Sequence, residues 1–284
     1  MTQSFRDAPL RYAMCNEAFA GQPFGEVCRT LRRLGYEGIE IAPFTLAPEP
    51  GAVSVGQRAE YRRLITDEGL VCVGLHWLLV TPKTIHVTTP DTKLRTESWA
   101  YVRDLVDLCA DLGDNGVMVF GSPKQRSSTG GLTPTEATRN FIDGMASIAD
   151  HAQARSVTLL MEALPKSQSD IVTTLEAAAG VVEAIHHPAV RTMFDTHNAE
   201  DETAPHAEVL EHYFHLIRHV HVNEMDGRHP GTGDYDFVSI FRTLKRLKYK
   251  GWVSLEAFDF KPGGEVIATE TINYLKRREM EADQ

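Results

Sequence analysis

Eight short stretches rich in β-branched or apolar residues recur along the chain, and most of them end on polar side chains. They cover residues 11–19, 38–44, 71–79, 115–123, 157–165, 190–197, 218–224 and 252–260. Stretches with the 3.6-residue spacing of an amphipathic helix lie between them. In the first of these, the apolar positions are Phe24, Val27, Cys28, Leu31 and Leu34. Gly35 then follows as a helix stop signal.

The alternation of strand and helix patterns indicates repeated β–α–β units and a parallel sheet. Eight such units are the number that closes a (β/α)8 barrel, the TIM-barrel fold. No linker rich in Pro, Gly or Ser divides the chain. The sequence therefore predicts an α/β protein with a single TIM-barrel domain over residues 1–284. The connection 79–97 is polar, contains two prolines and lacks a helical stripe, so it is expected to be a surface loop or a mobile flap.

Composition and charge restrict the function classes. The 284 residues are 42% hydrophobic, which leaves enough apolar material for one core, and the net charge of −10 argues against a nucleic-acid partner. No run approaches the roughly 20 apolar residues of a membrane helix, and the first ten residues lack a signal-peptide core. The four cysteines are far apart in apolar stretches, as free thiols are in a reducing compartment. We therefore expect a cytoplasmic protein.

Four of the predicted strands end on side chains that bind metals or move protons. Strands five to eight offer, in order, Glu162, Asp195, His221 and Glu256. Functional residues of a TIM barrel lie at the C-terminal ends of its strands, and alternation along a strand gives every second residue the same direction. The inward positions that precede the four are Leu160, Met193, His219 and Ser254.

These four side chains would converge in one small volume. Three carboxylates in one cleft repel one another, and burial makes each charge costly. A divalent cation relieves both effects, and three oxygen ligands with one imidazole suit Mn²⁺, Mg²⁺ or Co²⁺. Any one of the four residues alone is equally consistent with a hydrogen-bonded polar group in the core. Together they predict a metal site.

With separations of 33, 26 and 35 residues, this set resembles the metal-binding residues of the xylose-isomerase-like TIM-barrel superfamily of sugar (phosphate) isomerases and epimerases. By motif the chain is similar to ketose 3-epimerases of the D-tagatose/D-psicose type, and the similarity covers nearly the whole chain. It implies that the four residues bind one divalent ion, with Mn²⁺ expected and Co²⁺ or Mg²⁺ as alternatives. It also implies that Glu162 and Glu256 exchange protons on opposite faces of the sugar.

Three positions depart from the pattern of these epimerases. Gln168 stands where they carry a second glutamate, six residues after the strand-five ligand. Asn198 stands where they carry a substrate-binding histidine, and His197 lies one residue earlier. Gly227 stands where they carry an arginine, and Arg228 lies one residue later, before a Pro-Gly-x-Gly turn. We therefore expect the four metal ligands of these epimerases to have the same role in this chain. The residues that bind the sugar hydroxyls differ.

Five residues are candidates for contact with the substrate. His76 and Trp77 end the third strand, where the imidazole would bind substrate or carry a proton and the indole would stack on the sugar; packing in the core is the alternative for both. The other three are His197, Arg228 and Gln168.

Several further polar residues are open to two interpretations. Asn16 and Glu40 end strands one and two, where they would either bond sugar hydroxyls or close the barrel mouth. Lys124 and Gln125 follow strand four and would contact substrate or simply be solvated. His219 lies two residues deeper than His221 and is expected to be structural.

Three function classes follow from these residues. The first is a metal-dependent sugar isomerase or epimerase, which transfers a proton α to the carbonyl of a ketose or keto-sugar through a metal-stabilised cis-enediolate. The second is a lyase acting on 3-keto-glycosides, the catalytic subunit of a C-glycoside-cleaving complex, which would require a small partner subunit. The third is a relative of the endonuclease IV barrels, which the net charge disfavours. The first class is preferred, with a small-molecule sugar as partner, no nucleic acid or membrane, and a homo-oligomer left open.

Overall fold

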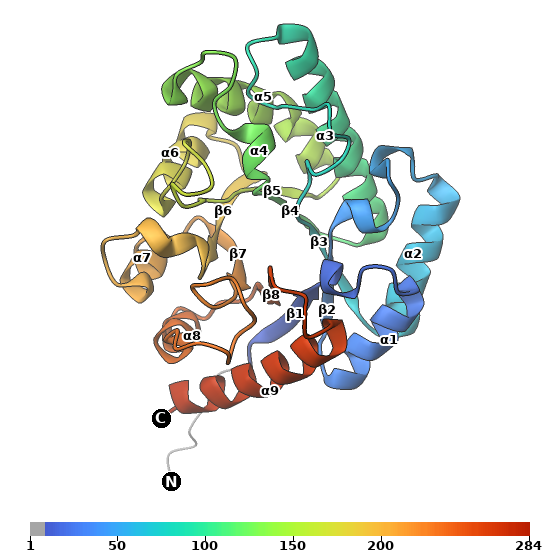
Figure 1. Ribbon diagram of the computed structural model, residues 1–284, viewed down its shortest axis with the longest axis vertical. Coiled ribbons are helices and arrows are strands. Elements are labelled where there is room, and N and C mark those ends of the chain that lie inside the picture. The colour runs from blue at the N-terminus through green and yellow to red at the C-terminus, as the bar shows by residue number, and fades with distance from the viewer. Residues whose placement is uncertain (1–8) are drawn as a thin grey trace.

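Eight parallel strands close into a barrel in the computed structural model, which describes residues 9–284 (Figure 1). The strands are β1 (Arg11–Cys15), β2 (Gly38–Ile41), β3 (Val71–Leu75), β4 (Val117–Phe120), β5 (Thr158–Met161), β6 (Val190–Asp195), β7 (Ile217–Val222) and β8 (Trp252–Leu255). Neighbours in the chain are neighbours in the barrel, and β1 pairs with β8 to close it. The predicted TIM-barrel fold is confirmed. The assignment of all of residues 1–284 to one domain stays a prediction, because residues 1–8 lie outside the described part.

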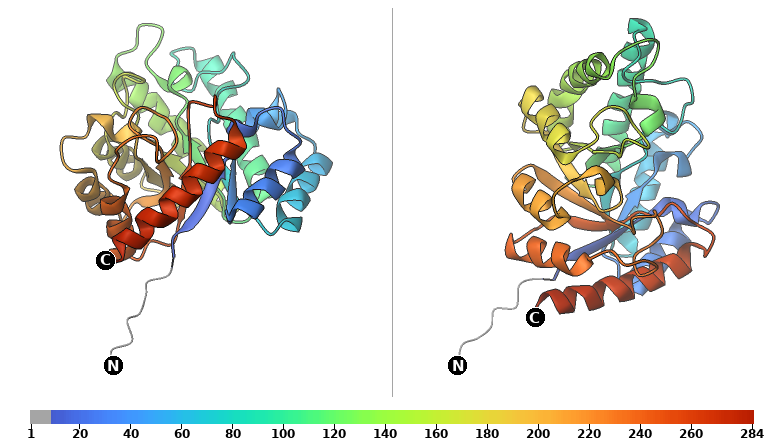
Figure 2. Two further views of the ribbon diagram at one scale, coloured as in Figure 1. Left: turned by 60° about the horizontal axis from the view of Figure 1, so that its bottom comes forward. Right: turned by 60° about the vertical axis from the view of Figure 1, so that its left-hand side comes forward.

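Helices surround the barrel on its outer side (Figure 2). They are α1 (Phe24–Leu34), α2 (Val55–Asp67), α3 (Thr92–Leu112), α4 (Pro123–Arg126), α5 (Pro134–Ala154), α6 (Leu175–Ile185), α7 (His206–Tyr213), α8 (Phe237–Arg246) and α9 (Gly264–Ala282). α9 contacts both α8 and α1 and so completes the outer ring. Within residues 9–284, none of the helices has the length and apolar character needed to cross a membrane.

Local signals set several of the helix ends. Thr133 and Glu136 form a capping box at the start of α5. Gly35 ends α1 with a φ of 95°, a left-handed conformation that glycine adopts without steric cost.

The predicted loop at 79–97 is wrong for its last part, because α3 already begins at Thr92. The side chain of Asp91 accepts hydrogen bonds from the backbone N–H groups of Lys93 and Leu94, which caps the helix. The first large apolar side chain that α3 buries is that of Trp99, so its first two turns carry no apolar stripe. A cap, and not hydrophobic spacing, therefore determines where this helix starts.

Two kinds of side chain fill the inside of the barrel. One end holds a small apolar cluster, made by Ala13, Val73, Val117, Val119, Leu160 and Met193. Leu160 and Met193 thus point inward, as the predicted register requires. Beyond this cluster, toward the C-terminal ends of the strands, fully buried polar residues such as Glu40, His76 and His219 take the place of apolar ones.

Candidate metal centre and active site

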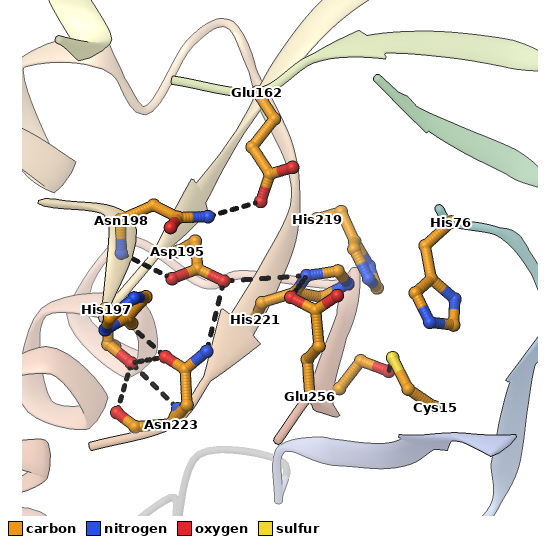
Figure 3. Close-up of polar contacts among 12 residues, drawn as sticks. Cys15, His76, Glu162, Asp195, His197, Asn198, His219, His221, Asn223 and Glu256 are labelled. Carbon is orange, nitrogen blue, oxygen red and sulfur yellow. Dashed lines mark hydrogen bonds and ion pairs between the residues drawn. The ribbon is translucent and has the colours of Figure 1, made fainter. Parts of the chain in front are cut away.

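Four side chains meet at the C-terminal ends of β5 to β8. Glu162 directly follows β5, Asp195 ends β6, His221 lies one residue before the end of β7, and Glu256 directly follows β8. Each offers a ligand atom, and these atoms lie within 4.8 Å of one another. All four side chains are buried, and Figure 3 shows them pointing toward a common volume. The structure thus brings together the whole set that the sequence predicted as metal ligands.

The electrostatics of this cluster favour a cation. Burial, together with the charges of Glu256 and Asp195, raises the pKa of Glu162 to about 8. Burial disfavours a charge on His221 as well, but the charges of Glu40 and Glu256 outweigh it and hold the pKa of His221 well above its usual value. For Glu256 the effect of burial is outweighed by His221, which lowers the pKa of this carboxyl. The cluster therefore retains protons that a divalent ion would displace, and its three carboxylates and one imidazole fit such an ion.

A buried glutamate of β2, Glu40, orients His221 of β7. The Nδ1 atom of His221 faces the other ligands, 3.1 Å from Glu256 Oε2 and 3.6 Å from Asp195 Oδ2. Its Nε2 lies 3.0 Å from Glu40 Oε1, and the other oxygen of Glu40 lies 2.8 Å from His219 Nε2. A carboxylate that accepts from the second nitrogen of a ligating histidine fixes its tautomer and ring orientation. Glu40 is thus a positioning residue, and leaves Nδ1 of His221 free to ligate.

We expect the substitution Glu40→Gln to weaken Mn²⁺ binding by about 10- to 100-fold, because the neutral amide no longer fixes the tautomer of His221. Calorimetric titration of the metal-free protein with Mn²⁺ measures this directly. The matched control is Glu270→Gln, which changes a second Glu–His pair, 2.9 Å from His229 Nε2 and outside the metal site. Equal metal affinity in the two variants would contradict the role assigned to Glu40.

Uncharged hydrogen-bond donors hold the carboxylates of Glu162, Asp195 and Glu256. Asn198 Nδ2 donates to Glu162 Oε1 at 2.9 Å, and the backbone N–H of Asn198 donates to Asp195 Oδ1 at 2.8 Å. Trp77 Nε1 donates to Glu256 Oε1 at 2.6 Å. The Trp77 ring also stacks on Phe258, with ring centroids 6.1 Å apart. Trp77, which the sequence proposed as a stacking partner for the sugar, therefore also fixes a carboxylate.

The two glutamates open onto a cavity of about 350 Å³. Its volume is near the lower end of the range for small-molecule sites. Gln168 and Asn198 line it beside Glu162 and Glu256, and Trp77 and Phe258 contribute aromatic surface. A small polar molecule in this cavity would touch both glutamates at once.

The remaining candidates for substrate contact lie in different surroundings. His76 is fully buried and does not line the cavity; its Nε2 lies 2.8 Å from Glu17 Oε2, which is the packed arrangement that the sequence left as an alternative. His197 lies beside the cavity, where its Nδ1 donates to the carbonyl of Met225 at 2.7 Å and its Nε2 is 3.3 Å from Gln168 Nε2.

Arg228 does not line the cavity either. Its guanidinium donates to Asp226 Oδ2 at 2.7 Å and to the carbonyl of Thr232 at 2.9 Å. Gly227 has a φ of 77°, and a Cβ atom there would lie 2.7 Å from the ring of Phe258. An arginine at 227 would therefore strain the turn and clash, so this loop cannot present the arginine of the related epimerases in the same way.

Two residues that the sequence analysis did not single out also support the site. Arg126 is fully buried and donates, at 2.7 Å each, to the carbonyls of Phe120 and Glu162, which ties the ends of β4 and β5 together. Asn223 accepts from the backbone N–H of His197 at 2.8 Å and so fixes the turn after β6. Their only sequence signal is their place shortly after strand ends.

The barrel and the cluster at its C-terminal end define a TIM-barrel protein with a candidate metal centre beside a small-molecule cavity. A family model described as "Xylose isomerase-like TIM barrel" matches residues 28–278. The chain belongs to this family.

Several named proteins are similar to this chain. L-ribulose 3-epimerase of Mesorhizobium japonicum is 24% identical over 249 residues, which are 87% of this chain and 80% of that protein. 3-Dehydro-D-guloside 4-epimerase of Escherichia coli is 23% identical over 257 residues, 85% of this chain and 89% of that protein. Among solved structures, a D-psicose 3-epimerase crystallised in the presence of D-fructose superposes with a TM-score of 0.83 at 18% identity, covering 97% of this chain and all of that one. This last similarity supports the fold.

Proposed function

We propose that the protein is a divalent-metal-dependent sugar epimerase or isomerase that transfers a proton α to the carbonyl of a ketose or keto-sugar. One observation carries this proposal: Glu162 and Glu256 belong to the same four-residue cluster and line the same cavity. Membership of the family supports it, as do the names of the relatives, which are sugar epimerases. Proton removal and return need two positioned acid–base groups, and these glutamates are the pair that the cavity offers.

The ion would be held by Glu162, Asp195, His221 and Glu256, and we propose Mn²⁺ because oxygen-rich sites with one imidazole suit it. A bound divalent ion supplies Lewis-acid polarisation of the substrate oxygen, which acidifies the neighbouring C–H bond. One glutamate accepts the carbon-bound proton and the other returns a proton to the opposite face or to the neighbouring atom. Which of them is the base depends on the direction of the reaction.

The hydrogen bonds of the site are consistent with these acid and base roles of the two glutamates. Asn198 and Trp77 each donate to one oxygen of a glutamate, which restrains the carboxylates without adding charge. The apolar surface of Trp77 and Phe258 excludes water from one side of the cavity. A substrate there is held between two fixed carboxylates, the geometry in which positioned acid–base catalysis is effective.

The proposal is tested by identifying products. The Mn²⁺-loaded protein is incubated with free ketoses, with ketose phosphates and ketohexuronates, and with 3-keto-glycosides, and the products are assigned by NMR. We expect an epimer or isomer of at least one of these sugars as the product. Release of the aglycone from a keto-glycoside without epimerisation would instead indicate the lyase class, and conversion of none of the sugars would contradict both. If Gln168, Asn198 and Gly227 mark a change of specificity, free hexuloses will be the poorer substrates.

The cellular compartment of the protein is a separate proposal. Cys15, Cys28, Cys72 and Cys109 are free and buried, which supports a reducing compartment such as the cytoplasm. Assembly into a homo-oligomer remains a prediction.

A further inference from the structure

Two lysines line the same cavity as Glu162 and Glu256. Lys83 lies in the loop between β3 and α3, and Lys124 lies in α4, directly after β4. The candidate ligands come from β5 to β8, and β4 and β5 are neighbours in the barrel (Figure 1). The lining of the cavity thus includes two carboxylates, Glu162 and Glu256, and two ammonium groups contributed by separate segments.

No carboxylate within residues 9–284 neutralises these two lysines. Over this part of the chain, the lysines that form ion pairs are Lys93 and Lys245. The whole protein has 39 acidic and 29 basic residues, so carboxylates are abundant elsewhere on the surface. Lys83 and Lys124 nevertheless remain unpaired at one cavity, where their positive charges reinforce each other.

The surface of the cavity is largely apolar. It includes Val80, Pro123 and Leu164. Lys83 and Lys124 are both exposed, so water and salt screen their attraction for an anion, most strongly at high ionic strength. Ser122 and Gln125, which also line the cavity, offer partners to sugar hydroxyls, whereas the two lysines are the lining residues that carry a positive charge. An anionic group is therefore the part of a ligand that Lys83 and Lys124 recognise best.

We propose that Lys83 and Lys124 bind an anionic group of the substrate, a phosphate or a carboxylate, at the end of the sugar remote from its reacting carbonyl. This inference rests on the proposed function and narrows its substrate class to anionic ketoses or keto-sugars. It also gives a physical reason for Gln168, Asn198 and Gly227: a site that holds its substrate by charge does not need the hydroxyl-reading residues of the neutral-sugar pattern. Lysine is a common point-charge ligand for phosphate.

The test measures binding, so that it does not depend on turnover. Dissociation constants of the Mn²⁺-loaded protein are determined by calorimetry for D-psicose, its 6-phosphate and a ketohexuronate with a terminal carboxylate. We expect at least one anionic sugar to bind tenfold or more tightly than D-psicose, and the better of the two identifies the group. Lys83→Met and Lys124→Met should each weaken that binding by about tenfold or more, since a charged hydrogen bond is lost, and leave D-psicose unaffected.

The matched control is Lys250→Met, a change of an exposed lysine in the loop that precedes β8, at the other end of the barrel. It should leave all three dissociation constants unchanged. Equal affinity for D-psicose and for both anionic sugars would overturn the inference. So would undiminished binding of the anionic sugar in the double variant, because its anion would then be held elsewhere, for example by the metal. Failure of the proposed function has a different signature: no conversion of any sugar, whatever the binding preference.

Discussion

Replacing Glu162 or Glu256 by glutamine is expected to lower turnover by about 10²–10⁴-fold while part of the metal affinity is kept. The amide oxygen of glutamine still coordinates a metal, but it does not accept the proton of a carbon acid. The measurement is kcat on the sugar identified by the product assay, together with the metal content of each purified variant. Glu265→Gln is the control, because Glu265 pairs with Arg33 at the surface, 2.6 Å away.

Near-normal turnover in both glutamine variants would refute the two-glutamate mechanism. Proton transfer would then have to involve another group beside the cavity. His197 is one such candidate, because its Nε2 lies 3.3 Å from the cavity residue Gln168. Loss of turnover together with all of the bound metal would show that these side chains act mainly as ligands.

Asp195→Asn is expected to remove most of the stabilisation that the metal provides. A ligand present at 100 times its dissociation constant stabilises the native state by about 2.7 kcal/mol, and a hundredfold loss of affinity would leave less than about 1 kcal/mol. The hydrogen bond from the backbone N–H of Asn198 to Oδ1 of residue 195 can be kept, so the change acts mainly on the metal. Thermal unfolding with and without Mn²⁺ measures the difference.

A second Asp-to-Asn change separates the effect on metal binding from a general loss of stability. Asp236 caps α8 by accepting from the backbone N–H of Ser239 at 3.1 Å. Asp236→Asn should therefore leave the Mn²⁺-induced rise in Tm unchanged, even if the Tm itself falls. An equal Mn²⁺-induced rise in Asp195→Asn and in the unsubstituted protein would contradict the assignment of Asp195 as a ligand.

The barrel and the ligand cluster could be predicted from the sequence because both follow from periodicity. Strand patterns alternating with helical ones predict the fold, and the fold places every strand end on one face. Glu162, Asp195, His221 and Glu256 each lie at or beside such an end, so their convergence required no knowledge of long-range contacts.

Hydrogen bonds between side chains far apart in the sequence could not be predicted from periodicity, because they depend on the local direction of the backbone. Trp77 has a φ of 50°, which bulky residues rarely adopt, and its indole donates to Glu256, far away in the sequence. The pairing of Glu40 with His221 likewise joins β2 and β7, which are not neighbours in the barrel, across 181 positions of sequence. No local pattern encodes either contact, which is why Trp77 was expected to stack and Glu40 had two open interpretations.

Isotope exchange tests the central claim most directly, that a metal-binding cluster at the strand ends moves a carbon-bound proton of a sugar. The substrate from the product assay is incubated in deuterated water with Mn²⁺-loaded protein, with protein treated with a chelator, and with treated protein to which Mn²⁺ is restored. We predict that NMR will show deuterium entering the sugar at the carbon α to the carbonyl in the first and third samples and not in the second. Product formed without deuterium, or exchange that continues after removal of the metal, would contradict the account.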